Sequence, residues 1–165
     1  MVCFSPVSDS SSQKAPIVHV EVDQSGKIGK TNEDTVLAFS NGLTYAVLIP
    51  RSVKQRCLRE LRRRGYQPNT IYLRLFAIGL YFLLREHMAR IDLAVIDVEY
   101  PGHEAQIRRF LLNLLRREQG GIRKEQIGFT YVGKTSPAHD VAIDIFRGVR
   151  KADRVLTEEE ILRQF

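Results

Sequence analysis

Short apolar runs alternate with longer periodic stretches along the 165 residues, and the two patterns predict strands and helices respectively. The short runs are rich in β-branched residues and are bounded by turn residues, which is typical of strands. They fall at residues 17–23, 35–40, 43–49, 91–98 and 127–132. Asn41-Gly42, between the second and third runs, is a strong hairpin signal, so these two strands are expected to pair directly.

The longer stretches predict the helices and the class of fold. Residues 52–65 and 68–84 predict two helices in succession, with Gly79 at a position where a neighbouring side chain can approach closely. Ser136 and Pro137 supply an N-cap and a first-turn proline for a later helix. The resulting order, βββ-α(α)-β-α-β-α, predicts an α/β fold. We expect a mixed five-stranded sheet with helices on both faces.

Composition predicts one globular domain preceded by a tail. Residues 1–15 are rich in serine and have no periodic apolar face, so they predict a disordered tail, and residues 16–165 predict a single domain. The most apolar helical stretch, residues 71–84, is shorter than the ~20 residues that a membrane span requires. The two cysteines, Cys3 and Cys57, show no pairing pattern. We therefore expect free thiols and a cytoplasmic location.

Arginine is concentrated in two predicted helices of a chain whose formal net charge is +6. Such clusters can follow a phosphate backbone, which predicts a nucleic acid as partner. A solvated helix face, partly neutralised by Glu60 and Glu118, is the alternative. The clusters comprise Arg56, Arg59, Arg62, Arg63 and Arg64 in the first helix and Arg108, Arg109, Arg116 and Arg117 in the second. Arg62, Arg63 and Arg64 are the predicted nucleic-acid contacts.

Carboxylates at strand ends and at a helix start are the candidates for chemistry. Asp23 ends the first strand, and Asp97 follows the apolar residues of the most buried strand. An unpaired carboxylate there is costly, and a hard divalent cation would offset that cost. Asp140 lies in the first turn of the helix opened by Ser136 and Pro137, next to His139. Plain turn chemistry is the commoner explanation for a single such aspartate, but Asp23 and Asp97 would meet if their strands are parallel neighbours.

The element order and these positions resemble the ribonuclease H-like nuclease superfamily, over residues 17 to about 150. Asp23-Gln24-Ser25-Gly26 resembles the aspartate-containing turn after the first strand of that family. Val95-Ile96-Asp97 resembles the stretch that carries its second metal-binding carboxylate. Residues 137–142 resemble the start of its last core helix. Ribonucleases H and Holliday-junction resolvases have aspartate there, and Piwi and UvrC-type nucleases have histidine.

The resemblance implies two-metal hydrolysis of phosphodiester bonds. It implies that Asp23, Asp97 and Asp140 bind Mg²⁺ or Mn²⁺, with His139 as the alternative to Asp140. Two differences from ribonuclease H leave open which branch of the superfamily the chain resembles. Gln24 replaces the usual glycine, and no glutamate clearly matches the one on the first helix of ribonuclease H. A resolvase-like nuclease is therefore as consistent with the sequence as a ribonuclease H.

Five further residues could assist at the same edge of the sheet. Glu99 shares a face with Asp97 by strand alternation, and His103 and Glu104 follow the same strand. Asp144 lies one helical turn beyond Asp140, and Lys134 precedes the last helix, where it could contact phosphate. Glu104 and Lys134 also have simpler explanations. A glutamate is favourable in the first turn of any helix, and a lysine is common on any protein surface.

Three functions stay open at this point. The first is a Mg²⁺-dependent nuclease, and the second is a non-catalytic ribonuclease H-like module that binds nucleic acid or a protein. The third is an unrelated α/β domain whose carboxylates are structural. Carboxylates that converge within metal-binding distance favour the first function, whereas scattered carboxylates beside contiguous arginines favour the second.

Overall fold

A mixed six-stranded sheet forms the centre of the computed structural model, which describes residues 16–165. The predicted tail, residues 1–15, lies outside the described residues. The strands are ordered β5-β4-β1-β2-β3-β6, with β2 antiparallel to both neighbours and the other pairs parallel. The elements are β1 (Val18–Ser25), β2 (Thr35–Ser40), β3 (Tyr45–Ile49), α1 (Arg51–Arg63), α2 (Pro68–Leu84), β4 (Ile91–Asp97), α3 (Glu104–Glu118), the 3₁₀ turn η1 (Lys124–Gln126), β5 (Ile127–Thr130), α4 (Pro137–Phe146), β6 (Arg154–Val155) and α5 (Glu158–Leu162).

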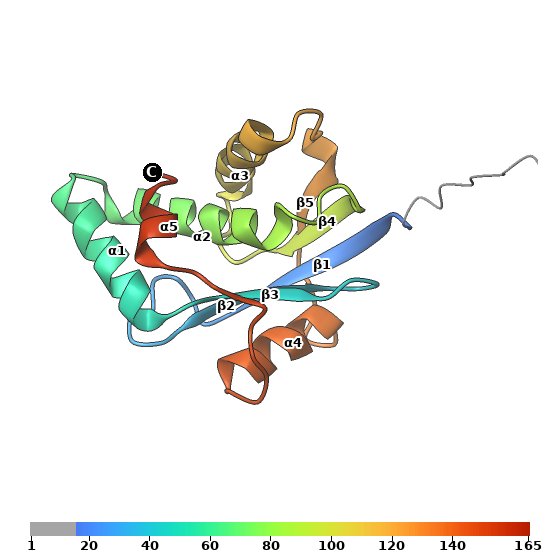
Figure 1. The fold of residues 1–165 in the computed structure, drawn as a ribbon, viewed down its shortest axis with the longest axis horizontal. Coiled ribbons are helices and arrows are strands. Elements are labelled where there is room, and N and C mark those ends of the chain that lie inside the picture. The colour runs from blue at the N-terminus through green and yellow to red at the C-terminus, as the bar shows by residue number, and fades with distance from the viewer. Residues whose placement is uncertain (1–15) are drawn as a thin grey trace, which may run out of the picture.

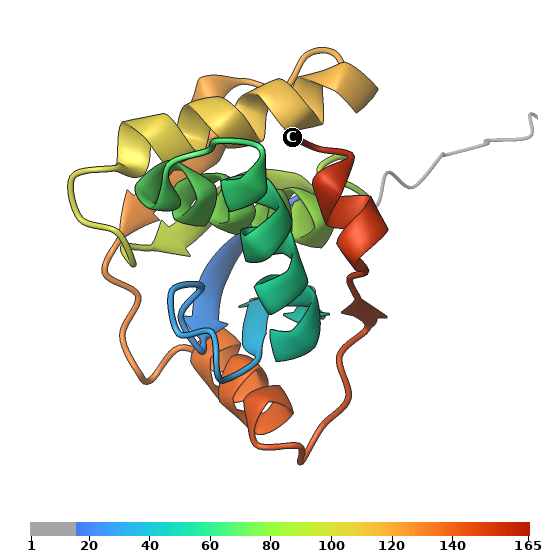
Figure 2. The same cartoon turned by 90° about the vertical axis from the view of Figure 1, so that its left-hand side faces the viewer.

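Helices cover both faces of the sheet, which confirms the predicted α/β class (Figure 1). α4 lies alone on one face and buries Val141, Ala142 and Ile145 against β2 and β3. The larger apolar core lies on the other face, beneath α1, α2 and α3, with α2 closest to the sheet. Figure 2 shows α3 and α4 at opposite ends of the molecule, so the two faces are well separated.

The predicted strand count was wrong, because β6 adds a sixth strand. β6 has two residues and pairs parallel with β3, so that Val47 lies opposite Arg154 and Leu48 opposite Val155. The Ala46 amide donates to the Asp153 carboxylate at 2.8 Å and so begins this pairing. Two residues are too few to show an alternating pattern, and their extended form depends on the contact with β3.

Two local predictions are confirmed by the backbone. Asn41 and Gly42 have positive φ angles of 105° and 87° in the loop of a hairpin between β2 and β3, whose last pair is Phe39 and Tyr45. Gly79 of α2 lies against Leu37, and a Cβ there would be 2.5 Å from the Leu37 Cδ1 atom. Glycine therefore lets α2 lie close to the sheet.

Lys54 of α1 fixes the connection between β1 and β2. Its side chain is fully buried, and its Nζ donates to the Lys27 carbonyl at 3.1 Å, the Lys30 carbonyl at 2.7 Å and Thr35 Oγ1 at 3.0 Å. Burial lowers the pKa of Lys54 to about 8. The three hydrogen bonds hold the segment that carries Lys27 at the carboxyl end of β1.

None of the helices among residues 16–165 has the length and apolar character needed to cross a membrane. α2 is the most apolar helix, and most of its residues are buried in the core.

Candidate metal centre at the ends of β1 and β4

The strand pairing brings Asp23 and Asp97 side by side. β1 and β4 are parallel neighbours, with Glu21 opposite Val95 and Val22 opposite Ile96. The next pair in this register is Asp23 and Asp97. Val22 and Ile96 point into the larger core, so alternation turns both aspartates to the face that carries α4. The predicted adjacency of these two strands, and their parallel direction, are confirmed.

Three carboxylates converge at this point. Asp23, Asp97 and Glu99 each offer one oxygen, and these oxygens lie within 4.8 Å of one another. Asp23 is only 5% exposed, and the other two side chains are half-buried. Carboxylate oxygens in such a group are the donors that hard divalent cations prefer. Glu99, predicted as an auxiliary residue, belongs to the centre itself.

Hydrogen bonds from Val132, after β5, and from His139 of α4 orient two of the carboxylates. The Val132 amide donates to Asp97 Oδ1 at 2.7 Å, and His139 Nδ1 lies 2.7 Å from Asp23 Oδ2. His139 belongs to the first turn of α4, where Ser136 accepts a hydrogen bond from the Ala138 amide, as the predicted N-cap requires. The start of α4 is therefore held against the end of β1.

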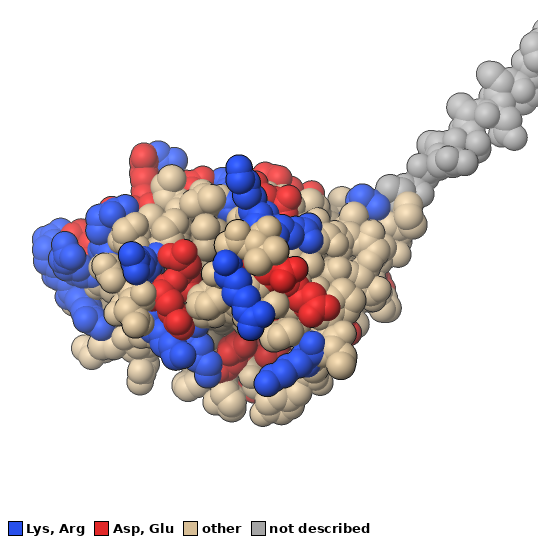
Figure 3. Space-filling model, turned by 90° about the horizontal axis from the view of Figure 1, so that it is seen from below, with Lys and Arg blue, Asp and Glu red and all other residues tan. Residues whose placement is uncertain are grey.

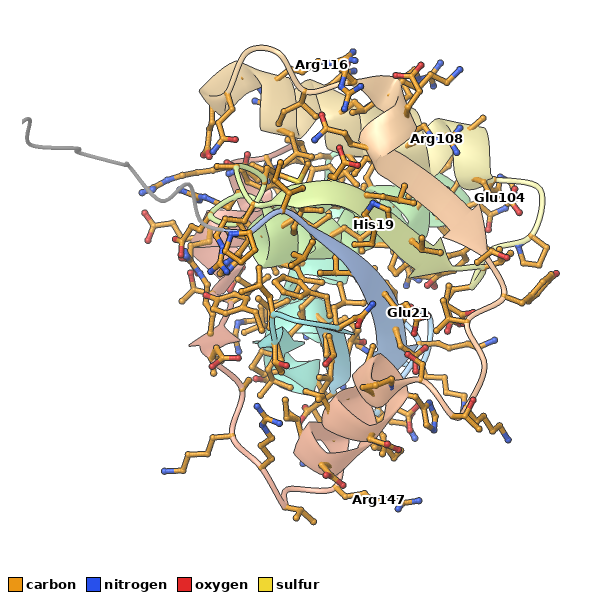
Figure 4. All side chains as sticks on the ribbon, turned by 90° about the vertical axis from the view of Figure 1, so that its right-hand side faces the viewer. His19, Glu21, Glu104, Arg108, Arg116 and Arg147 are labelled. Atoms are coloured by element: carbon orange, nitrogen blue, oxygen red, sulfur yellow. The ribbon has the colours of Figure 1, made fainter. Side chains whose placement is uncertain are left out.

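A further hydrogen bond ties the helix start to the sheet. The Ser136 hydroxyl also donates to the carboxylate of Glu21, which lies two residues before Asp23 on the same side of β1. Figure 4 shows Glu21 on β1 beside α4. Glu21 and Ser136 were not predicted as parts of the site, although alternation along β1 already puts Glu21 on the same face as Asp23.

The centre carries more negative charge than the protein neutralises. Burial raises the pKa of Asp23, against hydrogen bonds that lower it, and the Asp97 charge raises it further. Burial raises the pKa of Glu99 to about 7, and the nearby Asp97 charge adds to the rise. The Lys27 ammonium lowers the pKa of Glu99, so it is a cation close to the centre. Lys27 was not predicted as part of the site, and its glycine- and lysine-rich surroundings lack the spacing of a phosphate-binding loop.

Other predicted site residues lie outside this group of three carboxylates. Asp140 is exposed on α4, and Asp144, one turn further, is half-buried. His103 and Glu104 stand at the start of α3, and Figure 4 shows Glu104 well away from Glu21. Lys134 is exposed in the segment between β5 and α4. Their predicted roles stay predictions.

The arginines predicted on α1 are partly neutralised. Arg63 and Arg64 both bond to the Glu60 carboxylate, at 2.7 and 2.8 Å, and these contacts lower the pKa of Glu60 to about 2. Arg62 donates to the Tyr72 hydroxyl at 3.2 Å. The face that carries α4 shows acidic and basic side chains interspersed (Figure 3). Binding of nucleic acid by Arg62, Arg63 and Arg64 stays a prediction.

Comparisons of the chain with models of protein families, with curated proteins and with solved structures find no match. A function must therefore be argued from the geometry and charge of the centre.

Glu99→Gln is expected to stabilise the metal-free protein above neutral pH. The folded-state pKa of Glu99, about 7, exceeds the ordinary value of 4.5, so the folded protein binds more protons between these values. Stability should therefore fall as pH rises from about 4.5 to about 7. A pKa unit corresponds to 1.36 kcal/mol, so Gln should raise the free energy of unfolding by about 1–3 kcal/mol at pH ~8 and by little at pH ~4.

Urea unfolding in chelator at both pH values measures this effect. Glu125→Gln is the control, because Glu125 is exposed and outside the centre. Asp23→Asn and Asp97→Asn should also stabilise the metal-free protein at pH ~8, because each removes one of three negative charges that lie close together. An equal gain at both pH values would contradict repulsion between the carboxylates.

Proposed function

We propose that this protein is a divalent-metal-dependent nuclease of the ribonuclease H-like superfamily. The observation that carries the proposal is the convergence of Asp23, Asp97 and Glu99 within 4.8 Å, with more negative charge than nearby cations offset. Convergent carboxylates were the feature that separates a nuclease from a non-catalytic binding module. The resemblance of residues 17 to about 150 supplies the family and the reaction class.

The residues present fit Mg²⁺ or Mn²⁺. The donor set is made of carboxylates alone, which suits hard cations and not the thiolate and imidazole sets typical of structural zinc sites. The raised pKa values of Asp23 and Glu99 indicate that their negative charges lack full compensation, which a dication would provide. Asp23, Asp97 and Glu99 would hold the ions. When bound, the ions would lower the pKa of the attacking water and stabilise charge on the leaving 3′-oxygen.

The chain's own residues would fix the geometry of this reaction. The Val132 amide holds one Asp97 oxygen, and the His139 imidazole holds one Asp23 oxygen, so both carboxylates are oriented at the centre. Hydrogen bonds of this kind orient metal ligands, and their loss typically lowers metal affinity or activity by about 10- to 100-fold. Lys27 lies near Glu99, and its carbonyl accepts a hydrogen bond from the buried Lys54, which holds this segment in place. Lys27 supplies a positive charge for a substrate phosphate. Water would add to the phosphorus atom as the bond to the 3′-oxygen breaks, leaving a 5′-phosphate and a 3′-hydroxyl.

Calorimetric titration with Mn²⁺ tests the metal centre directly. The wild-type protein should bind Mn²⁺ at pH ~8, where Glu99 is ionised, and more weakly at pH ~6, because protonated carboxyl groups do not bind metal. The double variant Asp23→Asn/Asp97→Asn should show no binding above the level of non-specific surface sites. Asp92→Asn, on the same strand but exposed and paired with His19 and Arg123, is the matched control.

Equal Mn²⁺ binding by the wild type and the double variant would exclude the proposed metal centre. The non-catalytic module that binds nucleic acid or a protein would then be the better proposal.

A further inference from the structure

α3 carries two adjoining hollows that are lined by cations. The first has a volume of about 610 Å³ and lies between α2, α3 and the C-terminal residues, and the second has a volume of about 250 Å³ and lies between α3 and η1. Asn113 and Arg116 line both hollows, so the two form one continuous surface. We call it the α3 basic surface and define it by Arg74, Arg108, Arg109, Arg116, Arg117 and Lys124.

The charges of the α3 basic surface are not neutralised by the protein. Among residues 16–165, none of its six cations forms an ion pair with a carboxylate, and no aspartate or glutamate lines either hollow. Glu118, at the end of α3, is engaged by Tyr81 and Arg85 on its other side. On α1, by contrast, Glu60 is shared by Arg63 and Arg64, and Arg56 pairs with Glu158. Six cations without an ion-pair partner therefore lie together at α3.

Several of these guanidinium groups are held in place in advance of binding. Arg108 Nε donates to the Ile127 carbonyl and Arg116 Nε to the Ile122 carbonyl, each at 3.0 Å. These bonds use the inner nitrogen and leave the two terminal nitrogens available to a ligand. Arg74 stacks over the Phe165 ring, with 4.3 Å from its Cζ to the ring centroid. Side chains ordered beforehand lose less conformational entropy on binding, so this arrangement favours an anion with several acceptor oxygens.

The length of the surface favours a chain of phosphates over one small anion. Arg108 and Arg116 are eight residues apart, which corresponds to ~12 Å along the helix axis. Successive phosphates of one nucleic-acid strand advance by ~3.4 Å along the duplex axis, so this span matches about three or four phosphates. A single phosphorylated metabolite would fill one hollow and leave the cations of the other unpaired. Figure 4 shows Arg108 and Arg116 along α3 above β5.

The surface also leads toward the carboxylate centre. Arg108 is bonded to Ile127, at the start of β5, and Thr130, three residues later, pairs with Asp97. Three strand residues correspond to ~10 Å along β5. The α3 basic surface and the carboxylate centre lie on opposite faces of the sheet, so a strand held at Arg108 would reach the centre by passing around β5, which is the edge strand. We propose that the α3 basic surface binds the phosphate backbone of the nucleic-acid strand on which the carboxylate centre acts. The choice of ligand rests on the proposed function, but the binding itself requires no metal.

Binding is tested in chelator, so that it is separated from cleavage. The probe is a fluorescein-labelled single-stranded oligonucleotide of about 20 nucleotides, as DNA and as RNA, which is longer than most single-strand site sizes. The variant is Arg109→Gln/Arg116→Gln/Arg117→Gln, which removes three exposed charges. The matched control is Arg62→Gln/Arg63→Gln/Arg64→Gln, which removes the same charge from α1. Circular dichroism and thermal unfolding establish that both variants fold.

The α3 variant should bind at least ~10-fold more weakly at moderate salt. The negative slope of log K against log salt concentration should become shallower by about 2, because each lost phosphate contact on a single strand contributes ~0.7 to its magnitude. The α1 variant should lose less than about 3-fold. Equal losses in the two variants would mean that net charge alone governs binding, and unchanged binding by the α3 variant would exclude this surface. Either result overturns the inference.

The proposed function is judged by different variants in the same assay. Asp23→Asn/Asp97→Asn should bind the oligonucleotide in chelator at least as tightly as the wild type does, because two charges that repel phosphate are gone, while Mn²⁺ binding is lost. If the α3 variant binds the oligonucleotide normally and the aspartate variant has lost Mn²⁺ binding, the inference about the α3 basic surface is wrong and the proposed metal centre is supported. If the α3 variant loses oligonucleotide binding and the wild type shows no Mn²⁺ site, the proposed nuclease function is wrong and a nucleic-acid-binding module is the better proposal.

Discussion

Asp23→Asn and Asp97→Asn should each lower Mg²⁺-dependent cleavage of nucleic acid by a factor on the order of a thousand. Asparagine keeps the shape of the side chain but removes the charge that a divalent ion requires. Metal catalysis contributes several kcal/mol, and each 1.36 kcal/mol corresponds to a factor of ten in rate. The two aspartates are neighbours on parallel strands, so either loss should disable the same centre. Cleavage of labelled DNA, RNA and hybrid substrates with saturating Mg²⁺ measures the effect.

Asp92→Asn is the matched control for this loss. Asp92 is an exposed aspartate of the same strand, β4, and pairs with His19 and Arg123 at the surface. Its substitution should leave cleavage within about 2-fold of the wild type, because exposed ion pairs contribute little to stability. Wild-type cleavage by both Asp23→Asn and Asp97→Asn would exclude the proposed centre. Unfolding by urea should show that all three variants keep the wild-type fold.

Much of the sheet could be predicted because local chemistry and tertiary packing agree there. Asn41 and Gly42 favour the turn that the hairpin adopts, and the apolar residues of 91–98 suit a strand covered by helices on one side. β4 is not buried equally on its two faces, since Val95 and Asp97 are half-buried on the face that α4 covers incompletely. β6 could not be predicted, because its two residues become a strand only through contact with β3.

The candidate centre was predictable to the extent that strand periodicity determines it. Asp97 is the last residue of β4, Asp23 lies two residues before the end of β1, and Glu99 lies two residues beyond β4. The contribution of Lys27 depends on a long-range contact, in which the buried Lys54 holds the segment that carries it. The choice between His139 and Asp140 depends on how α4 is rotated about its axis. Both residues stand in the same first turn, and successive helical residues are ~100° apart, so only the packed helix shows which one faces β1.

His139→Ala should therefore reduce cleavage, whereas Asp140→Asn should not. His139 Nδ1 is 2.7 Å from Asp23 Oδ2, and Asp140 is exposed outside the group of three carboxylates. A residue that orients a metal ligand usually contributes 10- to 100-fold to activity or metal affinity, so we expect a loss in that range for His139→Ala. Asp140→Asn should cost only the favourable interaction of a first-turn carboxylate with the helix dipole, about 0.3–1 kcal/mol of stability. Cleavage rates at saturating and limiting Mg²⁺ measure the two activities, and urea unfolding measures the stability of Asp140→Asn.

Within the superfamily that the sequence resembles, this pair of variants also separates the branches. Loss in His139→Ala with Asp140→Asn tolerated corresponds to the pattern with histidine at the start of the last core helix. The reverse corresponds to ribonucleases H and Holliday-junction resolvases, and would require α4 to rotate so that Asp140 replaces His139 beside Asp23. His139→Gln is the informative third variant, because its amide can still donate a hydrogen bond to Asp23. Recovery of activity by glutamine would identify orientation of Asp23 as the role of His139, and failure to recover would indicate that the imidazole itself contacts the metal or the substrate.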